Sequence, residues 1–110
     1  MAKIEKQLWN DFDDLLGEIQ KQVLDGSMTA TLEDYSDFTS DHARCSVRVF
    51  ERYSALGGNR ASLSVTLFQE KDGPVHVSAI ASGGSVAMLF KINRLGEDAF
   101  LDTLRPVLDE

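Results

Sequence analysis

The spacing of apolar residues changes along this chain, and that change limits the folds open to it. Between residues 12 and 23 the apolar side chains recur every three or four residues, which places them on one face of a helix. From residue 28 they recur at every second residue, the period of a strand with one buried face. The chain therefore reads as an amphipathic helix followed by antiparallel strands, an α+β arrangement. The helical stripe consists of Phe12, Leu15, Leu16, Ile19 and Val23.

This stripe predicts a helix over residues 10–25. Asn10 is the expected N-cap, because its side-chain carbonyl can accept a hydrogen bond from the first turn. Asp13 and Asp14 follow at the end of the helix where the dipole favours negative charge, and Gly26 can close the other end.

Alternating segments predict the strands. A short edge strand is expected at residues 2–9, and four more at residues 28–33, 43–54, 61–69 and 75–80, with residues 35–42 as a polar loop. Asp72 and Gly73 are typical of a hairpin. Residues 86–92 are apolar on both faces, which favours a buried strand and leaves a helix open, and residues 96–108 predict a C-terminal helix that Pro106 kinks or ends.

The expected architecture is a single domain, residues 1–110, in the order β-α-β-β-β-β-β-α. Short turns between consecutive strands indicate an antiparallel sheet of five or six strands, with both helices on one face. We expect the odd-numbered apolar residues of segments 43–54 and 61–69 to face the core. These residues are Cys45, Val47, Val49, Leu63, Val65 and Leu67.

Cysteine count and charge exclude several classes of function. A single cysteine, Cys45, allows neither an intramolecular disulfide nor a zinc site built on several cysteines. No signal peptide or membrane-spanning run is visible, so a cytoplasmic location is expected. Residues 1–42 hold three lysines and ten carboxylates, which accounts for the whole net charge of −7. A nucleic-acid partner is disfavoured, because a chain with this negative charge repels the phosphate backbone. We expect no cofactor and no metal.

Single residues give weak functional signals. Cys45 is expected to be a buried structural thiol. His42 beside Asp41 could be a fragment of a metal site, and an ordinary polar loop is the stronger interpretation. Residues 82–85 (SGGS) could bind an anion through backbone N–H groups, although a tight hairpin needs the same glycines. No nucleophile, base and orienting group can be assembled, so enzymatic activity is not expected.

A collective feature is stronger. Arg44, Arg48 and Arg52 are spaced by four along one strand and so project from the same side. We expect one polar sheet face to carry them together with hydroxyl, aromatic and apolar residues. The full candidate binding face is Arg44, Arg48, Phe50, Arg52, Ser64, Thr66, Phe68, His76, Ser78 and Ile80.

Arginine and aromatic residues are enriched in protein interfaces. The leading hypothesis is therefore a non-enzymatic interaction module that forms a homodimer through this face. An ordinary exposed face is the simplest alternative. A small anionic ligand bridged by two guanidinium groups is another. A hydrolase-like enzyme that uses His76 and a serine of the same face is less favoured.

Several stretches together resemble a known family. They are residues 32–39 (LEDYSDFT), 47–60 (VRVFERYSALGGNR), 77–85 (VSAIASGGS), 90–93 (FKIN) and 96–101 (GEDAFL). They are similar to a family of short, uncharacterised proteins of Firmicutes-type bacteria, known only as a domain of unknown function. The resemblance covers nearly the whole chain and implies a stand-alone cytosolic bacterial domain, without an activity, cofactor or catalytic residue.

Overall fold

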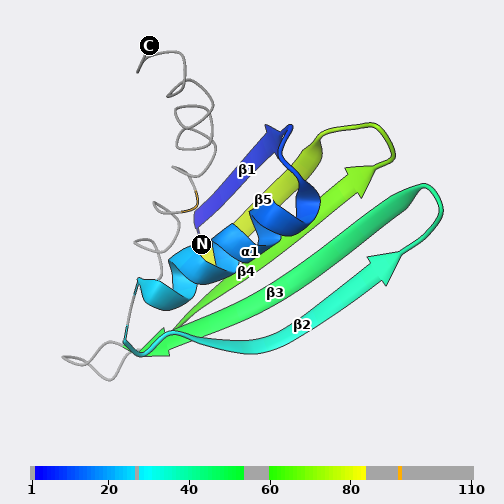
Figure 1. Cartoon of the computed structure of the whole chain (residues 1–110). Coiled ribbons are helices and arrows are strands. Elements are labelled where there is room, and N and C mark those ends of the chain that lie inside the picture. The colour runs from blue at the N-terminus through cyan, green and yellow to red at the C-terminus, as the bar shows by residue number, and fades with distance from the viewer. Residues whose placement is uncertain (1, 27, 54–59, 84–91, 93–110) are drawn as a thin grey trace, which may run out of the picture.

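The computed structural model describes residues 2–26, 28–53, 60–83 and 92. These residues form one antiparallel five-stranded sheet, crossed on one face by a single helix (Figure 1). The strand order is β1-β5-β4-β3-β2, so the first strand pairs with the last. The elements are β1 (Ala2–Leu8), α1 (Phe12–Asp25), β2 (Thr31–Thr39), β3 (Ala43–Tyr53), β4 (Arg60–Glu70) and β5 (Val75–Ser82).

Helix α1 lies where the apolar stripe predicts it. All five residues of the stripe are buried against the sheet. The N-cap is Asp11 rather than the expected Asn10, because Asp11 has an extended backbone and its Oδ2 accepts a 3.0 Å hydrogen bond from the backbone N–H of Asp14. Asp13 and Asp14 stand in the first turn, as expected.

Strands β4 and β5 confirm the predicted two-residue period. Leu63, Val65 and Leu67 are fully buried beneath α1, while Ser64 and Thr66 between them are half-buried on the opposite side. The predicted hairpin is confirmed as well. Asp72 takes a positive φ of 64° in the turn, and the N–H of Gly73 donates to the carbonyl of Glu70 at 3.0 Å.

The predicted orientation of β3 is wrong. Ser46, Arg48 and Phe50 are its buried residues, whereas Val47 and Val49 are only half-buried on the other side. The cause is the register with β4. Phe50 lies directly opposite Leu63, Arg48 opposite Val65 and Ser46 opposite Leu67. Cross-strand partners share a face, so the even-numbered residues of β3 join the core side.

Strand β2 is longer than predicted. The expected loop at 35–42 begins only after Thr39, because residues 31–39 pair with β3 as an edge strand, with a bulge between Leu32 and Asp34. Nearly every residue of β2 is exposed, so no apolar alternation marks it in the sequence.

The second half of the predicted architecture is tested only in part. The C-terminal helix lies outside the described residues, as does segment 86–92 apart from Ile92. Ile92 is buried in the same core cluster as α1, β4 and β5. The described residues thus support an α+β sheet with one helix, and the second helix and sixth strand stay predictions.

Candidate functional site

The ten residues of the predicted binding face lie on two different sides of the sheet. Arg44, Arg48 and Phe50 lie on the side covered by α1, and Arg52, which pairs with the buried Ala61, lies on that side too. The other six lie on the side opposite α1, which we call the open face. They are Ser64, Thr66, Phe68, His76, Ser78 and Ile80.

Arg44 joins the first turn of α1 to β3. Its Nη1 and Nη2 donate to the two carboxylate oxygens of Asp13 at 3.2 and 2.7 Å, and its guanidinium carbon lies 3.9 Å from the centre of the Phe12 ring. The hydrogen bond from Arg44 holds the pKa of Asp13 below its ordinary value, and Asp13 raises the pKa of Arg44 in return. The two hydrogen bonds to Asp13 compensate the charge of Arg44 on the side of the sheet that faces α1.

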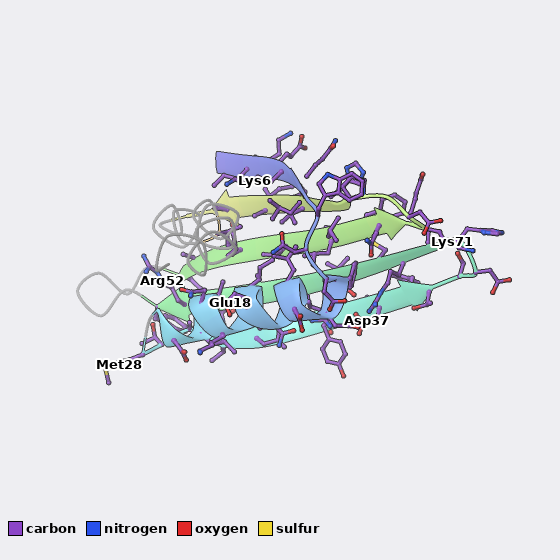
Figure 2. All side chains as sticks on the ribbon, turned by 45° about the horizontal axis from the view of Figure 1, so that its top comes forward. Lys6, Glu18, Met28, Asp37, Arg52 and Lys71 are labelled. Atoms are coloured by element: carbon purple, nitrogen blue, oxygen red, sulfur yellow. The ribbon has the colours of Figure 1, made fainter. Side chains whose placement is uncertain are left out.

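Arg48 makes a second connection, and it is nearly fully buried. Its Nε donates to Gln20 Oε1 of α1 at 2.9 Å, and its Nη1 and Nη2 donate to the carboxylate of Asp37 at 2.9 and 3.3 Å. Its Nη1 also donates to the Val47 carbonyl at 3.0 Å. In Figure 2 the labelled Asp37 lies on β2 next to α1. Arg48 therefore ties helix, central sheet and edge strand together.

Asp37 is held ionised by two neighbours. Its Oδ1 accepts a 2.6 Å hydrogen bond from the Ser46 hydroxyl, and this bond, followed by the bonds from Arg48, lowers the pKa of Asp37. Both arginines in the middle of the predicted site are thus engaged with carboxylates of this chain. Their role in the described structure is to hold α1 and β2 on the sheet.

The two lowered pKa values predict a loss of stability in acid. Protonation of Asp13 and Asp37 costs more in the folded state than in the unfolded state, so their contribution is present at neutral pH and is lost as the pH falls from about 5 to below 3. Urea titrations between pH 7 and pH 3 should show the decline, and the double variant Asp13→Asn, Asp37→Asn should show a shallower one. An equally steep decline in the variant would contradict this assignment.

The open face is organised in three rows that run across all five strands. Each row is a set of directly paired residues, from β1 to β2, and we name each after its β4 member. The Phe68 row is Gln7, His76, Phe68, Cys45 and Phe38; the Thr66 row is Glu5, Ser78, Thr66, Val47 and Ser36; the Ser64 row is Lys3, Ile80, Ser64, Val49 and Asp34.

Formal charge on these rows is confined to the edge strands. Lys3 and Glu5 of β1 form an ion pair at 3.2 Å, and Asp34 is the one acid that β2 contributes. The three central strands contribute nine residues to the rows, and none is charged when His76 is neutral. Next to the Ser64 row, toward the ends of β3 and β4 where Tyr53 pairs with Arg60, the side chain of Glu51 forms an ion pair with Arg60 at 3.1 Å. The centre of the face is therefore apolar and hydroxylated, with charges at its rim.

The open face carries exposed aromatic side chains and two hollows. Phe38 and Phe68 are exposed in the Phe68 row. Phe68 borders a hollow of about 480 Å³ that is also lined by Thr66, His76 and Ser78, and a smaller one of about 220 Å³ shared with Phe38. Both are shallow hollows of the surface.

Cys45 also lies on this face. It is half-buried between its cross-strand partners Phe38 and Phe68, which corrects the expectation of a buried core thiol. Cys45, Val47, Val49 and Phe38 were not predicted to lie on this face, and the register places them there. Cys45 pairs with Phe68, which is exposed. Knowledge of this register would have placed Cys45 on the same face as Phe68.

The two histidines lie apart, His76 on β5 and His42 in the turn between β2 and β3. His76 lies across from Phe68, with ring centroids 6.1 Å apart, and across from Gln7 on the other side. In the part of the chain that the structure describes, no hydrogen bond joins His76 to a serine, and Ser62 instead contacts Ser82. His42 lies in the β2–β3 turn, where its carbonyl accepts from the N–H of Lys71 at 2.8 Å.

Neither a metal cluster nor a membrane helix is present among the described residues. No three His, Cys, Asp or Glu side chains of these ranges are placed to share a metal ion. Within the same ranges, no helix has the length and apolar character needed to cross a membrane.

Gly83 belongs to the turn at residues 82–85 that could bind an anion. It has a positive φ of 68°, and a Cβ at this position would lie 2.7 Å from the Arg60 carbonyl, so the backbone itself requires this glycine.

Among the described residues, the fold is an α+β sheet with one face covered by helix α1 and the other face without a covering element. The chain belongs to the family of unknown function DUF6054, whose model matches residues 1–110. No curated protein and no solved structure matches it. The bacterial source and cytoplasmic location expected from the resemblance stay predictions.

Proposed function

We propose that this protein is a non-catalytic interaction module that self-associates through the open face of its sheet. The observation that carries the proposal is the uncharged centre of that face on a chain whose net charge is −7. A sheet face that serves only to meet water has no need of Phe68, Ile80, Val47 and Val49 together.

The composition of the face fits a protein partner. Protein interfaces are depleted of charge at their centre and enriched in aromatic residues, with polar and charged groups at the rim. The open face has this arrangement, with Phe38 and Phe68 exposed and with Lys3 and Glu5 at one margin. The proposed binding surface thus keeps the β4 and β5 residues of the predicted face and replaces its arginines by the outward residues of β3.

Charge distribution favours a second copy as the partner. The exposed side of α1 carries acidic residues, among them Asp14, Glu18 and Asp25, so two copies would repel each other through their helices. They can approach through the open face without that repulsion. Strands of 7 to 11 residues, with about 3.3 Å per residue and about 4.8 Å between strands, give a face of about 700 Å². Two such faces make about 1,400 Å², within the range of specific interfaces.

The remaining alternatives have less support. Arg44 and Arg48 already bind the carboxylates of Asp13 and Asp37, so they lend nothing to a site for a small anionic ligand. A hydrolase-like site would need His76 beside a serine, and its cross-strand neighbours are Phe68 and Gln7.

Sedimentation equilibrium of three proteins tests the proposal. The wild-type protein should form a dimer at micromolar concentration. Val47→Lys places an unpaired charge at the centre of the face and should raise the dimer dissociation constant at least about a hundredfold, because a buried unpaired charge costs several kcal/mol. Met28→Lys is the matched control, since Met28 is fully exposed outside the sheet, and it should dimerise as the wild type does.

Circular dichroism of the same samples establishes that Val47→Lys is folded. A wild-type protein that stays monomeric at millimolar concentration would end the proposal. So would a folded Val47→Lys protein that dimerises as tightly as Met28→Lys.

A further inference from the structure

We infer that two copies pack open face to open face about a two-fold axis parallel to β4, so that Lys3 of each copy lies over Asp34 of the other. The inference rests on the proposed self-association and adds its geometry. A face-to-face dimer requires an axis that lies between the two sheets, because only such an axis turns one face toward the other. The axis can run along the strands or across them, and the charges of the rim distinguish these two arrangements.

An axis along β4 makes full use of the face. Strand β4 is the middle strand of the five, with β5 and β1 on one side and β3 and β2 on the other (Figure 1). Rotation about it places β5 over β3 of the second copy and β1 over β2 of the second copy. The two sheets then overlap completely, which buries the largest apolar area that this face offers.

In this arrangement each row of one copy lies over the same row of the other. In the Ser64 row, Lys3 faces Asp34 of the second copy at both margins, and Ile80 faces Val49. In the Phe68 row, the two Phe68 rings meet at the axis. Opposite charges therefore meet at the rim and apolar side chains meet in the centre.

An axis across the strands, through the Thr66 row, gives the opposite result. Each residue of that row then faces the same residue of the second copy, so Glu5 faces Glu5. The Phe68 row lies over the Ser64 row, so Asp34 faces the exposed ring of Phe38 and loses any cationic partner. Like charges that face each other and a carboxylate against a phenyl ring are both unfavourable. The charge pattern thus selects the axis along β4.

Packed sheets are separated by about 10 Å and are rotated by about 30° relative to each other. Near the axis such a rotation moves facing residues by only a few ångströms. At the margins the shift is larger, and the flexible four-carbon stem of Lys3 can span it to reach a carboxylate.

Charge reversal tests this pairing in the full-length chain. Lys3→Asp alone and Asp34→Lys alone each place like charges opposite each other twice per dimer, and each should raise the dimer dissociation constant at least about tenfold. The double variant Lys3→Asp, Asp34→Lys should return it to within about threefold of the wild type. Within one chain the two residues lie on opposite edges of the sheet, about 19 Å apart, so no intramolecular pair can produce this recovery.

Cross-linking gives an independent test of the same axis. The arrangement places His76 over Cys45 of the second copy, since both belong to the Phe68 row on strands that flank β4. His76→Cys with a short bis-maleimide should give a covalent dimer on a denaturing gel. The control His76→Cys, Cys45→Ser should give none. A link between positions 45 and 76 of the same chain would migrate as a monomer and is therefore distinguishable.

The outcomes separate this inference from the proposed function. A dimer that Val47→Lys dissociates, but in which the double charge reversal does not recover, or in which His76→Cys gives no covalent dimer, overturns the axis and leaves the face intact. A wild-type monomer overturns both.

Discussion

Replacement of Phe50 by alanine is expected to lower the free energy of unfolding by about 3–5 kcal/mol, as for other fully buried phenylalanines. Phe50 has no exposed surface and lies opposite Leu63 beneath α1. Its removal leaves a cavity between helix and sheet that the surrounding strands cannot close. Urea denaturation followed by circular dichroism measures the loss.

The adjacent residue is the matched control for the orientation of β3. Val49 is half-buried on the open face, and Val49→Ala should cost only about 1 kcal/mol when measured at a concentration where the protein is monomeric. A larger loss for Val49→Ala than for Phe50→Ala would mean that β3 faces the core with its odd-numbered residues after all.

The second large effect is expected at Arg48. Arg48→Met keeps most of the side-chain length and removes every hydrogen bond to Gln20, Asp37 and the Val47 carbonyl. Because Arg48 is nearly fully buried and Gln20 and Asp37 each lose a hydrogen-bond donor, the free energy of unfolding should fall by about 2–3 kcal/mol. Urea denaturation is again the measurement.

Arg60→Met is the control for the loss of an arginine. Arg60 is exposed and pairs with Glu51 at the surface, so its replacement should cost less than about 1 kcal/mol. Equal losses in the two variants would show that Arg48 does not hold α1 and β2 on the sheet in the way described.

Elements with an unambiguous period could be predicted from sequence. Helix α1 carries five apolar residues at helical spacing and few elsewhere, so only one face could be buried. Strands β4 and β5 alternate apolar residues with serine, threonine and histidine, which leaves one choice of core face. In these elements local pattern and tertiary packing agree.

The orientation of β3 could not be predicted, because both of its faces contain apolar residues. Val47 and Val49 favour one side and Phe50 the other. Which side faces the core depends on Asp13 and Asp37, two residues distant in sequence from β3. Their carboxylates bind Arg44 and Arg48 and so allow these arginines to lie on the side of the helix. Such long-range compensation leaves no periodic signal.

For the same reason, the sequence places only some residues of the proposed surface on the open face. Its β4 and β5 residues follow from alternation, whereas Val47 and Cys45 were assigned to the core and Phe38 to a loop. Phe38 belongs to the exposed edge strand β2, whose polar sequence lacks the alternation that marks a half-buried strand. Two of the arginines that suggested a binding face, Arg44 and Arg48, bind Asp13 and Asp37 on the side of the helix, and the apolar residues beside them lie on the open face.

The rate at which Cys45 reacts with a maleimide tests the central claim most directly. Cys45 is the sole thiol of the chain and lies on the open face, between Phe38 and Phe68. If two copies cover this face, the rate constant of the wild-type protein should fall as the protein concentration rises through the dimer dissociation constant. That of Val47→Lys should stay at the monomer value throughout. A wild-type rate constant that equals the Val47→Lys value at every concentration up to millimolar would contradict the account.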